Sequence, residues 1–516
     1  MIKENFIYFL YQKDFTESGN DRYFLYKDSE FLEVESYDII SLDQFLITHD
    51  FWLISNSLYK KHGKLPLKVI DIVLFSKIVE GVKSVKEPTQ PWDISQTIKP
   101  LYKNSKDFDK YISIYYRKEI IDMNICMLFS HKLAEYTDSL LIKALNVGEY
   151  ERFFSLELPV YNKLVLSACR GIRVCKETIK HHKERLKLDF YRELKIFAEK
   201  HNVLYELPSD EDIKEKLIKL GYNLEDYSLE FLIDFLPSLD GYTDDLRNLQ
   251  KTNKSYRIFN SISSTKSRIS PIVESHLTST ARIYHKSPSI QNISKRYRDI
   301  FISDNEFHLC YVDYDQFEVG IMAALSNDPK MMHIYENMDA YKDLSKQIFN
   351  NESYRKKAKI IFLSYTYGMS LENILRSISQ LGGDQKIAKK YFSEFTIFES
   401  WKNILCNEFQ VKGKISSICS NYLNRKNTGQ LSDKEQRTAV NHVVQGSASY
   451  IFKMALLELS KIDDIQILIP MHDAVLFQYK NGFDTKLAVT IFENTMTDIL
   501  GGKIRGKASL QQFYQP

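Results

Sequence analysis

The stretch Cys310-Tyr-Val-Asp-Tyr-Asp-Gln-Phe-Glu-Val-Gly320 decides the fold of this chain. Tyr311 and Val312 are typical of a β-strand, and Asp313 follows them directly. Apolar residues then recur at the spacing of a helix, at Phe317, Ile321, Met322 and Leu325. The pattern predicts a strand that leads into a helix. A carboxylate at the end of a strand has little freedom, so Asp313 is a candidate metal ligand.

A second stretch, Ile465-Gln-Ile-Leu-Ile-Pro-Met-His-Asp-Ala-Val-Leu-Phe477, places Asp473 between two apolar runs that predict paired strands. Between the two stretches, Arg355 and Lys359 stand four residues apart on one face of a predicted helix. The two aspartates and the carbonyl of Tyr314 could bind two Mg²⁺ ions, with Mn²⁺ as a substitute. The two cations could bind phosphates. These are the parts of a phosphoryl-transfer site.

The same helix face passes Leu363 and ends at Tyr367, which together form a surface on which a base could stack. Lys359 could also donate a proton to a leaving phosphate. Plainer explanations exist for each residue taken alone. A strand-end aspartate is more often a cap or turn residue, Arg355 and Lys359 would lie on a solvated face, and Tyr367 would be a core aromatic. The combination favours a catalytic site.

Composition narrows the class of protein. With 516 residues, 44% of them hydrophobic, the chain can form several packed domains. Residues 251–300 carry ten Lys and Arg against two acids, which indicates contact with a phosphate backbone or, equally, a solvated surface. The six cysteines lack zinc-like spacing, and we find neither a membrane-length apolar run nor a signal peptide. We expect a reducing, cytoplasmic setting without a membrane partner.

The first 150 residues predict an α/β domain. Phe6–Tyr11 and Tyr23–Tyr26 are expected to pair as strands. Phe51–Ile54 and Val69–Phe75 are expected to be two more strands, or a strand and a helix. Asp28-Ser-Glu30 could bind a metal ion, but its context favours a plain turn.

From about residue 151 helical periodicity dominates. Cys175–Phe197 predicts a long amphipathic helix paired with another, and Ser209 predicts the start of a shorter one. Residues 251–270, rich in Lys and Ser, are the candidate for a flexible strap over nucleic acid. Further helices are expected at 339–349, 354–365, 371–379, 384–401, 433–461 and 485–499.

The C-terminal half resembles the family A DNA polymerases, those like bacterial DNA polymerase I. The family's first palm motif, D-Y-S-Q-I-E-L-R, is similar to Asp313-Tyr-Asp-Gln-Phe-Glu-Val-Gly320, and its last, V-H-D-E, to Met471-His-Asp-Ala474. The spacing of its fingers motif is kept by Arg355, Lys359 and Tyr367-Gly368. Further matches are Arg437-Thr-Ala-Val-Asn-His-Val-Val-Gln-Gly-Ser-Ala448, Thr280-Ala-Arg-Ile283 and Ser287-Pro-Ser-Ile-Gln-Asn-Ile293. The resemblance is strong over 270–516.

The resemblance implies a template-directed DNA polymerase that extends a primer with dNTPs on primer–template DNA, using two Mg²⁺ ions and acting as a monomer. It implies an α/β (α+β) right-hand fold with palm, fingers and thumb, beside an N-terminal ribonuclease H-like domain. The implied domains are 1–150 (degenerate 3′–5′ exonuclease-like), 151–260 (thumb), 261–335 and 411–516 (palm) and 336–410 (fingers). Whether a processivity partner binds is left open.

The resemblance also assigns roles to residues. Catalysis would depend on Asp313, Asp473 and Lys359. The dNTP would be bound by Gln316, Glu318, Tyr341, Arg355, Lys359, Leu363 and Tyr367. The primer–template would be bound by Arg282, Gln291, Asn292, Arg437, Asn441, Gln445 and His472. Glu318 would act as a steric gate that excludes a ribose 2′-hydroxyl, which favours dNTPs over rNTPs.

Four positions depart from the family pattern. Ala474 replaces a peripheral glutamate, so we expect a modest loss of activity, and Gly320 replaces an arginine. Leu363 stands where the family has Phe or Tyr, which weakens the expected base stacking and sugar discrimination. Tyr341 replaces a histidine that contacts the triphosphate.

The N-terminal region weakly resembles the family's 3′–5′ exonuclease domain at Leu53–Leu58 and Val69–Asp71. The D-x-E that this domain carries on its first strand is missing from Phe6–Tyr11, and its second-motif aspartate falls near Lys60. Because a two-metal nuclease needs several carboxylates, we expect a degenerate domain without proofreading.

Two rival interpretations stay open. A phage-type single-subunit RNA polymerase shares the palm; Glu318 argues against it, whereas Ala474 and Leu363 are compatible with it. The second rival is a catalytically dead DNA-binding scaffold. Retention of both aspartates together with Arg355 and Lys359 argues against a scaffold.

Overall fold

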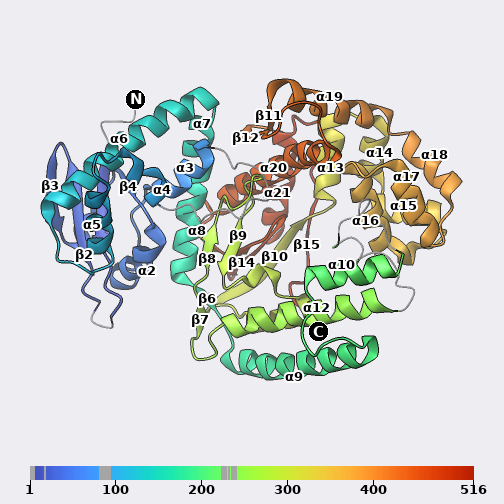
Figure 1. The fold of residues 1–516 in the computed structure, drawn as a ribbon, viewed down its shortest axis with the longest axis horizontal. Helices are drawn as coiled ribbons and strands as arrows, with labels where there is room; N and C mark the ends of the chain where they lie inside the picture. Colours follow the sequence, from blue (N-terminus) through green and yellow to red (C-terminus); the bar gives the residue numbers. More distant parts are fainter. Residues whose placement is uncertain are drawn as a thin grey trace.

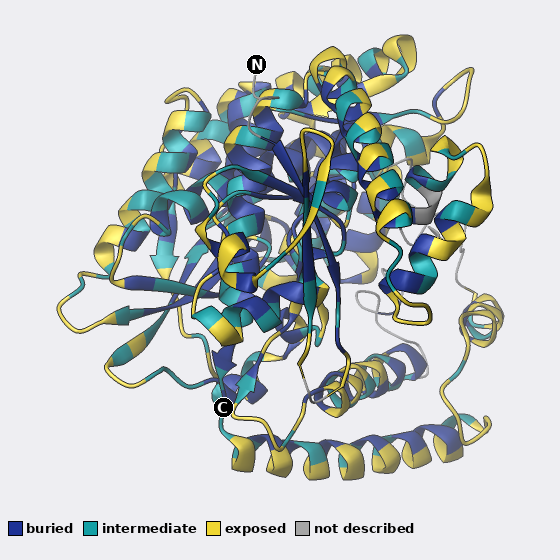
Figure 2. Ribbon diagram, turned by 90° about the vertical axis from the view of Figure 1, so that its left-hand side faces the viewer, coloured by how far each residue is buried: buried dark blue, intermediate teal, exposed yellow. Residues whose placement is uncertain are grey.

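The computed structural model describes residues 6–16, 19–80, 94–221, 229, 233 and 241–515. Parts of the predicted exonuclease-like and thumb ranges lie outside these residues. In Figure 1 a blue N-terminal unit lies on the left, a sheet lies in the centre, green helices lie below it, and yellow to orange helices lie on the right. Figure 2 shows buried strands in the interior and exposed residues on the outer helices and loops. No helix in the described ranges has the length and apolar character needed to cross a membrane.

A mixed five-stranded sheet, in the order β3-β2-β1-β4-β5, forms the N-terminal unit. Its strands are β1 (Phe6–Gln12), β2 (Arg22–Lys27), β3 (Glu30–Val34), β4 (Phe45–Thr48) and β5 (Val69–Asp71). Its helices are α1 (Ser36–Ser41), α2 (Phe51–His62), α3 (Ile72–Glu80), α4 (Ile94–Thr97), α5 (Ser105–Tyr115) and α6 (Met123–Val147). The antiparallel pairing of β1 with β2 confirms the predicted strand pair. Asp28 and Ser29 form the turn before β3, as predicted.

The prediction that Phe51–Ile54 is a strand is wrong. These residues open α2, whose buried residues Phe51, Ile54 and Leu58 recur at helical spacing, and Gly63 ends the helix in the left-handed conformation. The strand of this segment is β4, just before it. Val69–Phe75 is divided between the strand β5 and the helix α3, whereas the sequence predicted a single strand or a single helix there.

A helical column joins this unit to the rest of the molecule. It consists of α7 (Tyr150–Arg152), the π-helical segment η3 (Phe153–Glu157) and α8 (Leu158–Arg170). Below the central sheet lie α9 (Lys176–His201), α10 (Asp210–Lys219) and α12 (Tyr242–Ser261) (Figure 1). The long helix predicted from Cys175 is confirmed as α9, which packs against α12, and Ser209 caps α10 as predicted.

The predicted flexible strap over residues 251–270 is wrong in its first half. Residues up to Ser261 continue α12, because Leu249, Thr252 and Phe259 are buried on one helical face. After a short loop, β7 (Arg268–Ile269) pairs with β6 (Ile172–Arg173). Within the predicted strap, residues 262–267 and Ser270 are a loop.

The central sheet has the order β13-β14-β10-β15, with antiparallel neighbours. Its strands are β10 (Phe307–Tyr314), β13 (Ile465–Pro470), β14 (Ala474–Lys480) and β15 (Ala508–Leu510). Before it lie β8 (Ile272–Glu274), β9 (Tyr284–Ser287) and the 3₁₀ segments η4 (Ile290–Asn292) and η5 (Lys295–Ile300). The helices α13 (Phe317–Ser326), α20 (Asp433–Leu459) and α21 (Lys486–Ile499) share one core with the sheet.

The remaining helices form the group on the right of Figure 1. They are α14 (Pro329–Asn337), α15 (Ala340–Phe349), α16 (Arg355–Thr366), α17 (Leu371–Gln380), α18 (Gln385–Ser393) and α19 (Thr396–Lys412), followed by the hairpin β11 (Lys414–Ser417) and β12 (Ser420–Asn424). The prediction of one helix over 384–401 is wrong, because the chain leaves helical geometry at Phe395 and restarts as α19.

A fully buried ionic network ties the helical column to α20. Lys453 donates to Glu157 at 2.7 and 2.9 Å and to the carbonyl of Ser275 at 2.8 Å. Arg152 donates to Glu157 and also to Glu149, at 2.6 Å. Burial lowers the pKa of Lys453, although Glu157 opposes that shift. Each charge in the network depends on its partner, because a buried charge without one is costly.

Lys453→Met is therefore expected to destabilise the fold by about 3–5 kcal/mol, since it leaves Glu157 with one cation instead of two. Urea unfolding followed by circular dichroism would measure the change. Lys461→Met is the matched control, because Lys461 is exposed and pairs with Glu458 at the surface. Its effect should stay within about 0.5 kcal/mol. Equal stability of the two variants would show that the network adds nothing.

Candidate active site

Two aspartates from distant parts of the chain meet at one end of the central sheet. β10 pairs with β14 so that Asp313 lies opposite Ala474. The amide of Tyr314 donates to the carbonyl of Asp473 over 3.1 Å. The strand register therefore places the two carboxylates side by side, although no local sequence rule requires it.

The electrostatics of this pair suit a cation. Burial, and after it the charges of Asp473 and Asp315, raises the pKa of Asp313 to about 8, with Lys295 and Lys359 acting against the shift. The protein packed around Asp473 also raises the pKa of its carboxyl group by desolvation, even though part of the side chain is open to solvent. Oδ1 of Asp313 is buried without a hydrogen-bond partner among the described residues. A partnerless carboxylate oxygen beside a second carboxylate fits a hard divalent cation.

No group of three His, Cys, Asp or Glu side chains in the described ranges is arranged to bind a metal ion. The two aspartates would therefore need other oxygen ligands. The backbone carbonyl of Tyr314, phosphate oxygens of a substrate and water are the ligand types that Mg²⁺ takes in such sites.

Asp313→Asn is expected to stabilise the metal-free protein, and more so as pH rises. A carboxyl group with a pKa of about 8 when folded and about 3.9 when unfolded costs folding free energy that grows between those pH values. In EDTA, the melting temperature of the variant should exceed that of the wild type by about 1–3 °C at pH near 8 and by less at pH near 5. Mg²⁺ should raise the melting temperature of the wild type only. A difference independent of pH and Mg²⁺ would contradict this assignment.

The cationic face of α16 points at an aromatic ring. The guanidinium of Arg355 lies 5.4 Å and the ammonium of Lys359 lies 5.5 Å from the centre of the buried Tyr341 ring. Arg355 also pairs with Asp339 at 2.8 Å, the residue that caps α15. The ring thus contacts both cations, and the carboxylate of Asp339 fixes Arg355, before any ligand arrives.

A second polar group lies beside the aspartates. Glu318, in the first turn of α13, accepts from Arg282 at 2.8 Å. Burial, followed by the charge of Glu318, raises the pKa of Tyr367 well above its ordinary value. Burial and Arg282 lower the pKa of His472 to about 4, and its ring packs edge-on against Tyr284. The structure therefore brings Arg282, Glu318, Tyr367 and His472 together.

Two residues expected to bind ligands have side chains that hold the backbone. Gln316 donates to the carbonyl of Met338 and accepts from the amide of Ala340. Gln291 is buried and its Oε1 accepts from the amide of His285. Their roles in binding substrate stay predictions, and the structure gives each a positioning contact as well.

Three other predicted contacts lie along α20. Arg437, Asn441 and Gln445 are four residues apart and so share one helical stripe. Oδ1 of Asn441 is buried without a partner among the described residues, which leaves an acceptor available. The side chain of Gln445 faces the hydroxyl of Tyr367. Leu363 is half-buried on α16, on the side that leads to Tyr367.

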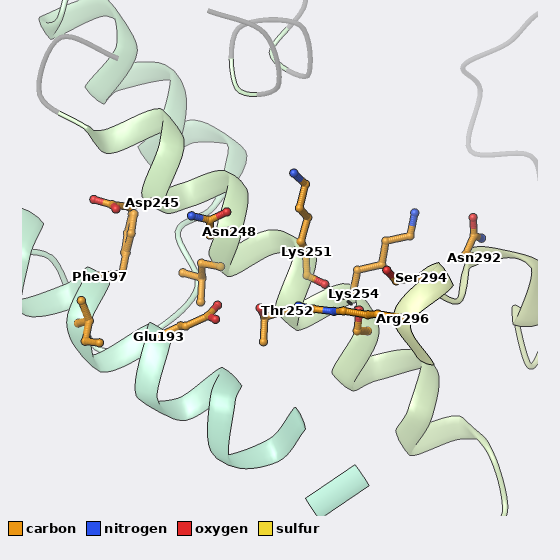
Figure 3. A pocket seen from close by; sticks show the side chains of 13 residues that line it. Glu193, Phe197, Asp245, Asn248, Lys251, Thr252, Lys254, Asn292, Ser294 and Arg296 are labelled. Carbon is orange, nitrogen blue, oxygen red and sulfur yellow. Dashed lines mark hydrogen bonds between the residues drawn. The ribbon is translucent and has the colours of Figure 1, made fainter. Parts of the chain in front are cut away.

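A cavity of about 650 Å³ opens where α9 and α12 meet the segment of η4 and η5. Figure 3 shows Lys251 and Lys254 from α12 and Arg296 from η5 around it, with Asn292 nearby. Glu193 and Asp245 also line it, so its charge is mixed. Part of the basic stretch predicted from residues 251–300 is therefore gathered at one cavity.

Comparisons with known proteins show the family and the fold of this chain. The family model described as DNA polymerase family A matches residues 175–505. The chain belongs to DNA polymerase family A. A DNA polymerase I from Streptococcus pneumoniae is 25% identical over 399 residues, covering 67% of this chain and 44% of that protein. DNA polymerase theta from Caenorhabditis elegans is 31% identical over 242 residues, covering 44% of this chain and 15% of that protein.

A solved structure supports the fold. The POL domain of Pol1 from M. smegmatis, in complex with DNA primer–template and dNTP, matches with a TM-score of 0.71 at 17% identity, covering 95% of this chain and 91% of that chain. The predicted α/β (α+β) polymerase fold is thus confirmed. The chain spans less than half the length of the two polymerases compared by sequence.

The structure explains two departures from the family A pattern. A Cβ atom on Gly320 would lie 2.6 Å from Met496 and 2.7 Å from the ring of Tyr335, so a larger side chain would have to displace these buried side chains. Ala474 is buried in the sheet opposite Asp313, where a glutamate would place a further carboxylate beside Asp313 and Asp473.

The sequence-based reasoning missed two charged neighbours of the aspartates. Asp315, whose Oδ1 accepts from Ser509 at 2.9 Å, raises the pKa of Asp313, and Lys295 lowers it. The alternation of Asp313 and Asp315 along the strand end could have indicated the first. Lys295 is distant in sequence, and no sequence signal indicates it.

Proposed function

We propose that this chain is a template-directed DNA polymerase that adds dNTPs to a primer 3′-hydroxyl. The observation that carries the proposal is the meeting of Asp313 and Asp473 at the sheet end, with Lys359 of α16 close enough to affect the pKa of both. Carboxylates for cations and a cationic helix for phosphates are what nucleotidyl transfer requires. Membership of family A supports the same reaction.

Polymerases of this family use divalent metal ions. Here Asp313, Asp473 and the Tyr314 carbonyl would hold two Mg²⁺ ions, or Mn²⁺ in their place; when bound, these would make the primer hydroxyl more acidic and neutralise phosphate charge. Arg355 and Lys359 would bind and orient the triphosphate, and Arg355 would exchange Asp339 for a phosphate oxygen. Lys359 would donate a proton to the leaving pyrophosphate.

The residues near Glu318 would select and check the substrate. Glu318, held by Arg282, would fill the space beside the sugar C2′. Leu363, Tyr367 and Tyr341 would line the dNTP site. Gln316 would fix the backbone beside that site through its hydrogen bonds to Met338 and Ala340. Arg437, Asn441, Gln445 and His472 would read acceptors that all base pairs share in the minor groove, with Arg282, Gln291 and Asn292 near the primer end.

The domains would follow the right-hand plan. The palm would be the central sheet with its helices (261–335 and 411–516), the fingers the group around α16 (336–410), and the thumb α9, α10 and α12 (151–260). Residues 1–150 would form a degenerate exonuclease-like domain. Two observations support the loss of nuclease function. The strand β1 has no carboxylate in its run Phe6–Gln12. On the same strand, the hydroxyl of Tyr11 forms hydrogen bonds with the hydroxyl of Tyr115 at 2.9 Å and the carbonyl of Asp50 at 2.6 Å.

Primer extension tests the proposal. A labelled primer on a DNA template with Mg²⁺ should be extended by dNTPs and left intact when nucleotides are omitted. Extension mainly by rNTPs would favour the RNA polymerase interpretation. Shortening without nucleotides would show an active nuclease. No extension in any lane would favour the scaffold.

Glu318→Ala is expected to reduce discrimination against rNTPs by about tenfold or more, because it removes the bulk beside C2′. Single-turnover incorporation of matched dNTP and rNTP pairs would measure the ratio. Glu318→Gln is the control, since it keeps the size of the side chain and loses its charge. Selectivity retained in Glu318→Ala would rule out a steric gate at this position.

A further inference from the structure

A groove on the N-terminal side of the molecule is separate from the candidate active site. One wall is a stripe of α8 with residues spaced by four, at Leu158, Asn162, Leu166 and Arg170, and the other is the loop at residues 63–68. The enclosed volume is about 530 Å³, within the range of sites that hold ligands. We call this surface the α8 groove. In Figure 1, α8 stands between the N-terminal unit and the central sheet.

The α8 groove is preformed, because hydrogen bonds fix its two walls to each other. Asn162 accepts from the amide of Val69 at 3.3 Å and donates to its carbonyl at 3.4 Å, which ties α8 to β5. Leu158 and Leu65 are buried at the base, whereas Leu67 at the rim is 75% exposed. Leu67 thus extends the apolar base to the rim as one continuous apolar surface, which a partner could contact.

Cations surround the apolar base. Lys64, Lys68, Lys163 and Arg170 line the groove, and no Asp or Glu lines it. Lys68 pairs with Asp43 at 2.9 Å. Within the described part of the chain, the other three have no carboxylate at ion-pair distance; Lys163 reaches only the carbonyl of Ser460, at 3.5 Å. The local charge is therefore positive and largely uncompensated.

We propose that the α8 groove binds an acidic peptide segment of a partner protein. The bulky apolar side chains of the peptide would occupy the base of the groove beside Leu158 and Leu166, and the carboxylates of the peptide would pair with the surrounding cations. A nucleic acid strand would pair with the cations but leave the apolar base unfilled. Charge and apolar surface together thus favour an acidic peptide over either a nucleic acid or a purely apolar segment.

The groove would place such a partner next to the catalytic unit without covering it. Ser167, on the neighbouring face of α8, donates to the carbonyl of Ile467 in β13 at 2.6 Å. The partner would thus be held on a helix that contacts the sheet carrying Asp473. The proposal does not depend on the proposed function, because binding can be measured without nucleotides or DNA.

Fluorescence anisotropy with the full chain tests the proposal. The probe is a fluorescein-labelled peptide of about 12 residues, rich in Asp, with Leu and Phe three or four positions apart. Saturable binding that weakens with added salt is expected. The same peptide with Ala for Leu and Phe, or with Lys for Asp, should bind at least about tenfold more weakly.

The variant Lys64→Glu/Lys163→Glu/Arg170→Glu should lower affinity for the acidic peptide by about tenfold or more while primer extension stays unchanged. The control Lys103→Glu/Lys106→Glu/Lys118→Glu makes the same charge change at exposed positions elsewhere in the N-terminal unit and should bind as the wild type does. Circular dichroism melting would confirm that both fold. Absence of saturable binding, equal loss in both variants, or binding of anionic vesicles or single-stranded DNA in place of the peptide would overturn the proposal.

Discussion

Asp473→Asn is expected to lower the rate of primer extension by about a thousandfold or more while leaving affinity for primer–template DNA nearly unchanged. Asparagine has the size of aspartate but not its charge. The variant would therefore keep the strand register that joins Asp473 to Tyr314 and lose one of the two carboxylates proposed to hold the metal ions. Pre-steady-state incorporation of a single dNTP and anisotropy with labelled primer–template would separate the two effects.

Asp464→Asn is the matched control, because Asp464 lies just before the same strand pair and forms a surface ion pair with Lys480 at 3.4 Å. It should retain the wild-type rate. Near-normal extension by Asp473→Asn would remove this residue from the catalytic assignment. Loss of DNA affinity along with the rate would show instead that the substitution disturbs the fold.

Lys359→Ala is expected to lower the incorporation rate by about 10²–10³-fold, since it removes a cation from the triphosphate and the proposed proton donor. Lys359 is exposed, so the loss should come from chemistry and not from stability. Its charge also opposes the raised pKa values of Asp313 and Asp473. The pH dependence of the rate should therefore shift to higher pH in the variant, because both carboxylates would ionise later.

Lys356→Ala serves as the control on the same helix, since Lys356 is exposed and lies one residue from Arg355, off the Arg355–Lys359 face. Lys359→Arg separates the two proposed roles: it keeps the positive charge, but arginine cannot give up a proton. Full activity in Lys359→Arg would leave charge alone as the contribution. Full activity in Lys359→Ala would exclude both roles.

Local patterns in the sequence were sufficient for several helices, among them α9, α10 and α13, and for the strand pair around Asp473. Ser209 caps α10 through its own side chain, and the helical spacing after Asp313 produced α13, because such signals depend on residues three or four apart. They failed at Phe51–Ile54, where an apolar run too short to show its period was assigned to a strand. They also failed over residues 251–261, where Lys and Ser on the exposed face of α12 concealed a buried stripe.

In the candidate site, too, the sequence predicted some features and missed others. The identity of Asp313, Asp473, Arg355 and Lys359 could be predicted from residue type and spacing, and family membership supports the assignment. The contacts that surround these four residues could not be predicted from the sequence. The pairing of Arg282 with Glu318, the charge of Lys295 near Asp313 and the ring of Tyr341 beneath two cations are contacts between residues far apart in the sequence.

Residue patterns alone indicate most local elements and the kinds of side chain available for chemistry. Which side chains meet, which are buried, and hence which carboxylates have raised pKa values depend on the packed fold. The physical reason is that helices and caps are stabilised by interactions within one or two turns, whereas desolvation and charge coupling depend on every element packed around a group. The α8 groove belongs to this second category, because its two walls come from segments about a hundred residues apart.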